Sequence, residues 1–301
     1  MHATVSVILK GFSMSAPTNT AAPSTGPGLL APRPIVGLLT DFGLVDDAVG
    51  ICKGMVLSIA PHANIVDVTH DVTPFDIYEA GLYIRDSFRY FPADAVFACV
   101  TFPHTGVQDN AIGLRTPQGH TYFAPNNGLL TRIAKEAGVA EVRRITAEKV
   151  RRPVIDPTFY GRDIVISAAA HIANGVPFSE IGEEIEASEI TLLEVAEPVV
   201  EGDWIVGEVA ILDKNYGNVW TSITREFLDA RGIAFDAELE IEIGDARLTT
   251  PLRRTFGEAG DVGEPLAYIA SRDQLGLALN QGDFAARYGV ERGHAVRLKA
   301  R

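Results

Sequence analysis

Short apolar runs alternate with segments of helical periodicity through the first half of the chain. The apolar runs predict strands at Ile35–Thr40, 65–68 and 95–101, and the segments between them, 46–60 and 75–90, have the spacing of amphipathic helices. Alternation of this kind predicts a largely parallel sheet with helices on both faces. Function is then expected at the carboxyl ends of the strands.

Two further apolar segments flank a turn, and two more helical patterns follow them. Ala111–Arg115 and 120–123, joined by Thr-Pro-Gln-Gly, predict a hairpin. The segments 129–137 and 162–174 predict helices. Both additions fit the α/β pattern of the first half.

The pattern changes near Gly175, where an acidic connector leads into short alternating segments with turn signals between them. Strands are predicted at Trp204–Leu212, 219–223, 237–243 and 295–298. Such segments are typical of a small antiparallel barrel or sandwich. The predicted organisation is an α/β domain at 35–180, a linker at 181–200 and a smaller all-β domain at 201–301.

Residues 1–34 are predicted to be a disordered tail, because they are rich in Ser, Thr, Ala, Pro and Gly. The apolar piece at 5–9 is too short for the core of a signal peptide, and its lysine follows rather than precedes it. Met14 is a second candidate start. The fold is therefore expected to begin at Ile35.

Composition narrows the class of protein. The 301 residues are 47% hydrophobic, and no apolar run approaches the length of roughly 20 residues that a membrane-spanning helix needs. A net charge of -13 disfavours binding to nucleic acid, which depends on clustered Lys and Arg. Cys52 and Cys99 lie in apolar surroundings and are too few for a disulfide framework, so both are predicted to be reduced core thiols of a cytoplasmic protein.

Several common catalytic signatures do not occur in the sequence. His70 and His171 lack the spacing of a helical zinc site, so both are interpreted as hydrogen-bonded structural residues, and no catalytic metal is predicted. Neither a Gly-x-Ser-x-Gly elbow nor a glycine-rich phosphate loop is present. Serine hydrolysis and ordinary nucleotide chemistry are therefore disfavoured.

Two residues stand out where strands give way to helices. Asp41 directly follows a predicted strand, so its carboxylate is expected either to cap the next helix or to bind a ligand. Phe75 follows a proline at the start of a predicted helix, where a residue that packs into the core is the simpler interpretation. The polarity pattern alone leaves both alternatives open.

Six short motifs follow one another in a characteristic order. They are Leu39-Thr40-Asp41-Phe42-Gly43, Phe102-Pro103-His104-Thr105-Gly106, Asn126-Asn127-Gly128, Asp156-Pro157-Thr158-Phe159-Tyr160-Gly161-Arg162, Asp213-Lys214-Asn215-Tyr216-Gly217-Asn218-Val219-Trp220 and Ser271-Arg272. In this order they resemble the S-adenosylmethionine-dependent halogenase and hydroxide-adenosyltransferase family. The resemblance runs from Ile35 to the C-terminus and implies S-adenosylmethionine as substrate, with no separate cofactor.

The resemblance implies a substrate site with residues from both domains. In the first domain it assigns Asp41 to the ribose hydroxyls and places Phe75 and Phe159 against the substrate. In the second domain it assigns Asp213 to the methionine ammonium, Tyr216 to adenine stacking, Asn218 to the adenine edge with Trp220 nearby, Ser271 and Arg272 to the methionine carboxylate, and Phe256 and Asn280 to the adenine pocket. Members of the family place the first domain of one subunit against the second domain of a neighbour, so a homotrimer is implied.

Three positions separate the branches of this family. The hydroxide-using branch has Asp, Arg and His where this sequence has Phe102, Asp109 and Tyr160. Those polar groups handle the attacking water, so their replacement argues against hydrolysis. The halogenating branch is similar to this chain here, although its members usually have Tyr at the position of Phe102.

Further differences indicate chloride rather than fluoride. Gly161 stands where the fluoride-using members have Ser, Phe75 stands where they have Trp, and their long hairpin loop is here a tight turn. Chloride is more easily desolvated than fluoride. Thr105 and Gly161, with an apolar wall of Phe102 and Tyr160, are the predicted catalytic residues around the halide.

The predicted reaction is attack of chloride on the 5′ carbon of S-adenosylmethionine, giving 5′-chloro-5′-deoxyadenosine and L-methionine. Two alternatives stay open at this point. One is hydrolysis of S-adenosylmethionine to adenosine and methionine, and the other is a sensor that binds S-adenosylmethionine or adenosine without chemistry. Analysis of the products distinguishes the three.

Overall fold

The computed structural model describes residues 33–103, 105–106 and 110–301. Most of the predicted tail, the candidate start Met14 and the position of Asp109 fall outside these residues, so what the sequence indicates for them stays a prediction. Within the described part of the chain, no helix is long and apolar enough to span a bilayer.

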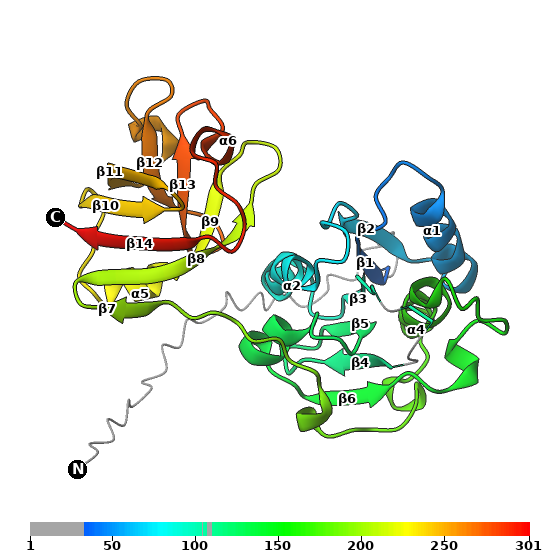
Figure 1. Ribbon diagram of the computed structural model, residues 1–301. Coiled ribbons are helices and arrows are strands. Elements are labelled where there is room, and N and C mark those ends of the chain that lie inside the picture. The colour runs from blue at the N-terminus through cyan, green and yellow to red at the C-terminus, as the bar shows by residue number, and fades with distance from the viewer. Residues whose placement is uncertain (1–32, 104, 107–109) are drawn as a thin grey trace, which may run out of the picture. The chain divides into compact units, whose positions relative to one another are not determined.

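Six strands form the first sheet. Their bounds are β1 Ile35–Thr40, β2 Asn64–Thr69, β3 Val96–Val100, β4 Ala111–Arg115, β5 Thr121–Pro125 and β6 Glu141–Arg144. The strand order is β2-β1-β3-β5-β4-β6 (Figure 1). Strands β2, β1, β3 and β5 run parallel, while β4 pairs antiparallel with both of its neighbours. This sheet confirms the predicted α/β fold class.

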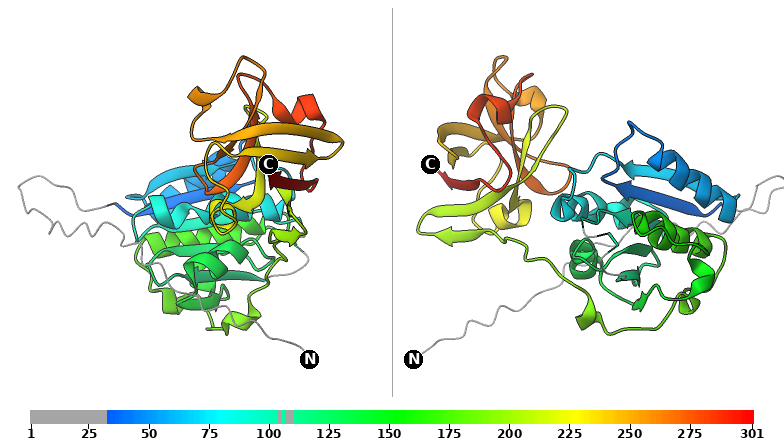
Figure 2. Two further views of the ribbon diagram at one scale, coloured as in Figure 1. Left: turned by 90° about the vertical axis from the view of Figure 1, so that its left-hand side faces the viewer. Right: turned by 45° about the vertical axis from the view of Figure 1, so that its right-hand side comes forward.

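Helices cover both faces of this sheet (Figure 2). Their bounds are α1 Ala48–Ile59, α2 Ile77–Arg85, α3 Ser87–Tyr90, the π-helices η1 Ile133–Ala137 and η3 Gly161–Ile166, and α4 Ser167–Ala173. Val36 and Leu38 of β1 pack with α1, η3 and α4, whereas Leu39 packs with α2 and η1. Because successive strand residues point to opposite faces, β1 is buried on both sides, and only loops extend from its carboxyl end.

Eight strands form the second sheet, which closes into a barrel. Their bounds are β7 Val199–Glu201, β8 Trp204–Leu212, β9 Val219–Thr224, β10 Glu238–Ile243, β11 Ala246–Arg253, β12 Pro265–Ile269, β13 Gln274–Leu279 and β14 Ala295–Ala300. Pairing of β14 with β8 closes seven of these strands, and β7 adds to β8. The predicted all-β barrel is thereby confirmed.

Short helices complete the chain. They are α5 Arg225–Asp229 and α6 Phe284–Tyr288, with the 3-10 turns η2 Glu148–Val150, η4 Phe178–Glu180, η5 Ala187–Glu189 and η6 Phe256–Glu258. The barrel core is built from inward-facing apolar residues such as Leu239, Ile241 and Ile243, which alternate with outward-facing residues along β10. This period-2 pattern is what the sequence shows for a half-buried strand.

The sequence pattern does not predict five of the strands: β6, β7, β11, β12 and β13. Three of the four residues of β6 are charged, and β11 carries arginines and a proline. All of β13 is buried, so it reads as a continuous apolar run without alternation. The β11–β12 pair is parallel, which departs from the antiparallel arrangement expected of the barrel.

The helix predicted at 75–90 is broken in two and starts later than expected. The Asp76 side chain accepts a hydrogen bond from the Glu79 N–H at 2.9 Å, so it caps α2 and leaves Phe75 outside the helix. The chain then breaks at Asp86 between α2 and α3. Glu79 and Arg85 fall outside the predicted apolar face, yet they are only 4% and 5% exposed.

Polar contacts explain the burial of these two residues. Glu79 accepts from the Tyr83 hydroxyl at 2.7 Å, and Arg85 donates to the backbone carbonyl of Arg272, in the β12–β13 turn, at 2.8 Å. Leu82, from the same helix, packs with Ile211 of β8. Apolar periodicity identifies the face of a helix that meets a core, but it does not distinguish solvent from a polar contact with another part of the fold.

Candidate active site

Asp41 lies at the carboxyl end of β1, where its carboxylate joins two loops. Its Oδ2 accepts a hydrogen bond from the Phe75 N–H at 2.9 Å. It does not cap the next helix, because the N–H of Ala48, the first residue of α1, donates instead to Asp46. Burial raises the pKa of the Asp41 carboxyl above its usual value, and the bond from Phe75 opposes that shift in part.

Phe75 does not pack into the core. The residue is 68% exposed, and its backbone has a φ of 70°, which is uncommon for a residue with a large side chain. The bond from its N–H to Asp41 accompanies this conformation. The core-packing interpretation of Phe75 is therefore wrong, and the structure presents an aromatic surface beside the Asp41 carboxylate.

Two loops that are distant in sequence, one with the described residues 102–103 and 105–106 and the other 156–161, lie against each other at the end of β3. Gly106 has a φ of 84°, and a Cβ added there would lie 2.5 Å from the carbonyl oxygen of Pro157. A Cβ on Gly161 would lie 2.5 Å from Cγ1 of Val100, the last residue of β3. Both glycines are therefore required for close approach. Thr105 is exposed beside Gly106.

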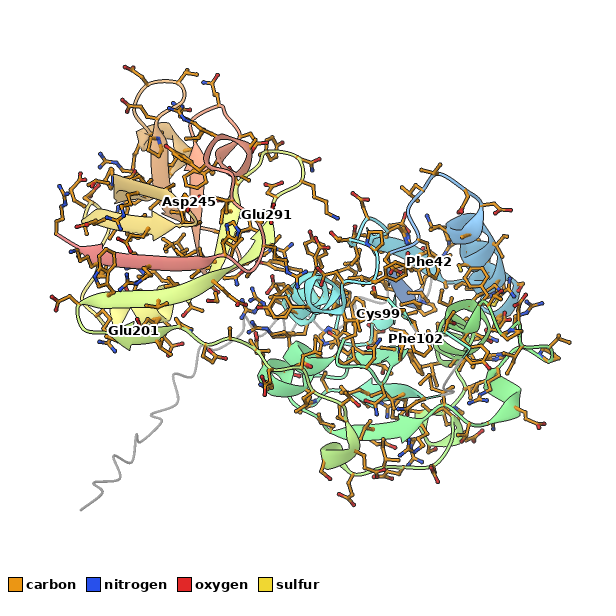
Figure 3. The ribbon with its side chains drawn as sticks, viewed as in Figure 1. Phe42, Cys99, Phe102, Glu201, Asp245 and Glu291 are labelled. Carbon is orange, nitrogen blue, oxygen red and sulfur yellow. The ribbon has the colours of Figure 1, made fainter. Side chains whose placement is uncertain are left out.

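Aromatic rings line the inner side of these loops. Phe42, Phe102, Phe159 and Tyr160 are half-buried and pack on the same apolar core under the sheet. The Phe42 and Phe159 rings meet edge to face, with centroids 5.5 Å apart. Figure 3 shows Phe42 and Phe102 on neighbouring strand ends of the six-stranded sheet. The loops thus present an apolar wall at its carboxyl edge.

Asp163 anchors the second loop from inside η3. Its side chain is fully buried, and it accepts hydrogen bonds from the Asp156 N–H at 2.8 Å, from Arg162 Nε at 2.6 Å and from Arg152 at 3.1 Å. Burial raises the pKa of the Asp163 carboxyl, but these hydrogen bonds outweigh that effect and hold the pKa below its usual value. The residues at the two ends of the loop, Asp156 and Arg162, therefore donate hydrogen bonds to the same carboxylate.

Replacement of Asp163 by asparagine should lower the free energy of unfolding by about 3 kcal/mol, because it leaves the Arg162 guanidinium without its charged partner. The depressed pKa gives stability that is present above the unfolded value of about 3.9 and is lost as the pH falls through the folded pKa. Urea denaturation should therefore show a gap between parent and variant at pH 7 that narrows below pH 4.

Asp229→Asn provides the matched control. Asp229 pairs with Arg225 at the surface of α5, with its side chain 54% exposed. An exposed pair contributes only about 0–1 kcal/mol, so this variant should unfold almost like the parent. Equal effects of the two variants would show that Asp163 does not anchor the loop.

The barrel contains a pocket of about 750 Å³ that gathers most of the residues assigned to the second domain. Its lining includes Asp213, Tyr216, Asn218, Trp220, Phe256 and Ser271. The turn that carries the first three is closed by the Asp213 N–H, which donates to the Asn218 carbonyl at 2.8 Å. The Asn218 side-chain amide donates to Asp213 Oδ2 at 3.3 Å, which fixes the two polar groups beside each other.

The aromatic groups of this pocket include one that the sequence pattern does not single out, Tyr268 of β12. The Trp220 indole N–H donates to the Tyr268 hydroxyl at 2.8 Å, and the Phe256 and Tyr268 rings lie 4.7 Å apart. Gly276 makes room for this ring, since a Cβ there would lie 2.4 Å from it. Tyr216 remains 70% exposed at the mouth. A Tyr facing a Gly across paired strands is the signal that could have identified Tyr268.

Arg272 and Asn280 lie outside this pocket. Arg272 donates to Asp86 at 3.3 Å and lies over the Trp220 ring at 5.5 Å, and it lines a neighbouring pocket of about 270 Å³ together with Asp213 and Trp220. The Asn280 side chain donates to the Gly260 carbonyl at 2.7 Å. Of the eight second-domain residues, the structure therefore groups six and places Arg272 at their border.

Contacts bear on the interpretations of His70 and of the two cysteines, while that of His171 stays a prediction. His70 is hydrogen-bonded to Thr40 and Asp67, as expected of a structural residue. Both cysteines are free and buried, and burial raises the pKa of Cys52 to about 12. Among the described residues, no group of three or more His, Cys, Asp or Glu side chains is placed to hold a metal ion.

The structure defines an α/β protein whose sheet is followed along the chain by a closed β-barrel with a pocket lined by aromatic side chains. Family models for the SAM hydroxide adenosyltransferase N-terminal and C-terminal domains match residues 36–182 and 207–297. The chain belongs to this S-adenosylmethionine halogenase and hydroxide adenosyltransferase family, as the motifs indicated.

Similar proteins include members of both branches. A fluorinase of Nocardia brasiliensis is 35% identical over 89% of this chain and 97% of its own length. An (R)-S-adenosyl-L-methionine hydrolase of Salinispora tropica is 31% identical over 90% of this chain and 100% of its own. The crystal structure of an uncharacterized conserved protein from Thermotoga maritima has a TM-score of 0.82 at 34% identity, covering 88% of this chain and 99% of that one.

The family membership fixes the chemistry at a coarse level. The protein is an enzyme of a family that acts on S-adenosylmethionine as an adenosyltransferase, with halide or hydroxide as the second substrate and no separate cofactor. The fluorinase is 35% identical and the hydrolase 31% identical to this chain, so both branches are represented among its relatives. The choice of nucleophile therefore depends on the residues of its own site.

Proposed function

We propose that this enzyme transfers the adenosyl group of S-adenosylmethionine to chloride. Chloride attacks the 5′ carbon opposite sulfur, so a carbon–chlorine bond forms while the carbon–sulfur bond breaks and its electron pair moves to sulfur. The products are 5′-chloro-5′-deoxyadenosine and L-methionine. The sulfonium is a good leaving group, so catalysis requires a positioned, poorly solvated anion rather than a general acid.

The observation that carries the proposal is the chemical make-up of the two contacting loops. Phe102 and Tyr160 occupy positions where the hydroxide-using branch has Asp and His, and both pack on an apolar core. In the described part of these loops the one carboxylate, Asp156, already accepts from the N–H and hydroxyl of Thr158. A water molecule would find no free base there, whereas an anion stripped of water gains nucleophilicity.

The choice of chloride over fluoride rests on space and donors. Thr105 offers a hydroxyl, and Gly161, at the start of η3, offers a backbone N–H near the positive end of a helix. The β4–β5 connection is a tight turn, in which the Gly119 N–H donates to the Thr116 carbonyl at 3.0 Å. This short turn and Gly161 favour the larger, more easily desolvated anion.

The proposed binding roles follow the two groups of residues. The carboxylate of Asp41 accepts from the ribose hydroxyls, with Phe75 and Phe159 against the nucleoside. In the barrel, the residues proposed for the adenine are Tyr216, Asn218, Trp220, Phe256 and Asn280, and those for the methionine are Asp213, Ser271 and Arg272. An Arg fork suits a carboxylate, although Arg272 would have to share its donors with Asp86.

We also propose that the complete site forms in a cytoplasmic homotrimer, between the α/β domain of one subunit and the barrel of the next. Phe75 and Tyr216, proposed to contact one substrate, are 68% and 70% exposed in the single chain. Exposed aromatic side chains next to polar groups are typical of surfaces that meet a partner. The buried thiols of Cys52 and Cys99 fit a reducing compartment.

Product analysis tests the proposed reaction. The purified enzyme is incubated with S-adenosylmethionine in acetate buffer containing chloride, bromide, fluoride or no halide. The products are separated by chromatography and identified by mass spectrometry. The expected result is a deoxyadenosine product with the chlorine isotope doublet that disappears without chloride. If adenosine and methionine form regardless of halide, the enzyme is a hydrolase like the Salinispora tropica relative. If S-adenosylmethionine binds but no product forms, the protein is a sensor.

Thr105→Ala should raise the chloride concentration at half-maximal rate about tenfold, because a lost hydrogen bond to an anion costs roughly 1.5 kcal/mol or more. Thr105→Ser keeps the hydroxyl and should restore most of the affinity. The measurement is the initial rate as a function of chloride at saturating S-adenosylmethionine. An unchanged chloride dependence in both variants would remove Thr105 from the halide site.

A further inference from the structure

A chain of hydrogen bonds leads from Lys53 in α1, through Asp67 and His70, to Thr40 next to Asp41. Lys53 Nζ donates to Asp67 Oδ2 at 2.6 Å, Asp67 Oδ1 lies 3.0 Å from His70 Nε2, and His70 Nδ1 lies 2.8 Å from the Thr40 hydroxyl. The His70 imidazole and the Thr40 side chain are buried, at 4% and 1% exposed. The chain thus links a surface lysine to the residue that precedes Asp41.

The direction of each bond follows from the groups involved. Hydrogen bonds from Lys53 and His70 outweigh the effect of burial and hold the pKa of Asp67 below its usual value, so its carboxylate is an acceptor. His70 Nε2 therefore carries the proton, and Nδ1 accepts from the Thr40 hydroxyl. The Thr40 oxygen in turn accepts from the Phe42 N–H at 3.3 Å. Each donor along the chain finds one acceptor.

His70 also holds the same turn through its backbone. Its carbonyl accepts from the Gly43 N–H at 2.8 Å. Asp41 thus lies between Thr40, whose hydroxyl is hydrogen-bonded to the His70 imidazole, and Phe42, whose N–H is bonded to that hydroxyl. Gly43 follows, and its N–H is bonded to the His70 carbonyl. The Asp41 carboxylate itself is held by the Phe75 N–H. The conformation of this turn therefore depends on His70 directly at Thr40 and Gly43, and through Thr40 at Phe42.

We propose that His70 is a positioning residue for substrate binding: its imidazole bridges Asp67 and Thr40 and fixes the β1 turn, so that the Asp41 carboxylate is oriented for the ribose diol. This inference rests on the proposed role of Asp41. A carboxylate that accepts from two vicinal hydroxyls needs a defined orientation, and small misplacements are costly. The imidazole acts through Thr40 and does not touch substrate.

Ligand pairs that differ only in the diol test this inference. Calorimetry measures the binding of adenosine and of 2′,3′-dideoxyadenosine to the full-length enzyme and its variants. His70→Ala and Thr40→Val should each weaken adenosine binding about tenfold while leaving the dideoxy analogue within about twofold, since the loss acts through hydrogen bonds to the ribose worth about 1.4 kcal/mol. Thr40→Val keeps the shape of the side chain, so it gives a readout even if His70→Ala does not fold.

Two further variants complete the design. Lys53→Met removes only the outer bond of the chain and should bind both ligands like the parent, while His70→Asn keeps an acceptor toward Thr40 and should recover part of the loss. If Asp41→Asn weakens the binding of both ligands equally, or of neither, the proposed ribose role of Asp41 is wrong. If Asp41→Asn weakens adenosine binding selectively but Thr40→Val does not, the ribose role stands and the positioning role of His70 is overturned.

Discussion

Replacement of Gly161 by serine should lower kcat/KM for adenosyl transfer by a hundredfold or more. A Cβ at this position would lie 2.5 Å from Cγ1 of Val100, a branched side chain in the middle of the sheet that has little freedom to move. The start of η3 would therefore shift away from β3 and carry Tyr160 and the 161 N–H with it. Misplacement of a reacting group by about 1 Å costs on the order of a hundredfold in rate.

A second substitution separates this steric effect from the chemistry of the serine hydroxyl. Val100→Ala removes the Cγ1 contact, so the double variant Gly161→Ser with Val100→Ala should regain much of the lost rate, and Val100→Ala alone should stay active. Gly54→Ser is the outside control, because Gly54 is exposed in α1, has no positive φ, and leaves open space within 4 Å of an added Cβ. Initial rates at saturating chloride provide the measurement. A fully active Gly161→Ser single variant would contradict the close approach as the reason for glycine.

The α/β sheet and the barrel were predictable where one period dominates the sequence. β1 and β8 have the bounds that the polarity pattern gives them, because both are mostly apolar runs that end directly before an aspartate. β12 and β13 were not found, since their side chains are mostly buried and carry no alternation. Periodicity reports a difference between two faces, so a strand buried on both faces is recognised only where its apolar run is clearly bounded, as in β1.

The candidate site was predictable only in part, for a related reason. The motifs gave the residues, but the contact between Gly106 and Pro157 joins loops about fifty residues apart and depends on backbone geometry that no local pattern encodes. The partnership of Thr40, His70 and Asp67 likewise needs β1 and β2 to be neighbours. The sequence predicts a structural role for His70, and its hydrogen bonds to Thr40 and Asp67 confirm that role.

Buried polar contacts were the least predictable feature. Arg272 was assigned to a carboxylate of the substrate, yet in the single chain it donates to Asp86, while Arg85 holds its backbone carbonyl. An arginine presents several donors, so one acceptor does not exclude another. Sequence patterns identify the residue type suited to an anion, whereas the competing acceptor is known only once the fold brings α2 to the β12–β13 turn.

Asp41→Asn should lower kcat/KM for S-adenosylmethionine about a hundredfold. The asparagine oxygen can still accept from the Phe75 N–H, but the amide nitrogen cannot accept from a ribose hydroxyl. Hydrogen bonds to a charged acceptor contribute roughly 1.5–3 kcal/mol each, and 2.7 kcal/mol corresponds to about a hundredfold. Asp46→Asn is the matched control, because Asp46 only accepts from the Ala48 N–H at the start of α1. A loss of the same size in both variants would point to the fold rather than to the ribose.

The pH dependence supplies an independent check of the same carboxylate. Burial raises the pKa of Asp41 above its usual value, so as the pH falls the group is protonated sooner than an exposed Asp would be. The protonated form loses its charge and donates where it should accept, so kcat/KM should fall on an acid limb above the value of about 3.9 typical of Asp. Asp41→Asn has no proton to gain, and its kcat/KM should be flat over that range. An acid limb that persists unchanged in Asp41→Asn would assign it to another group and remove Asp41 from substrate binding.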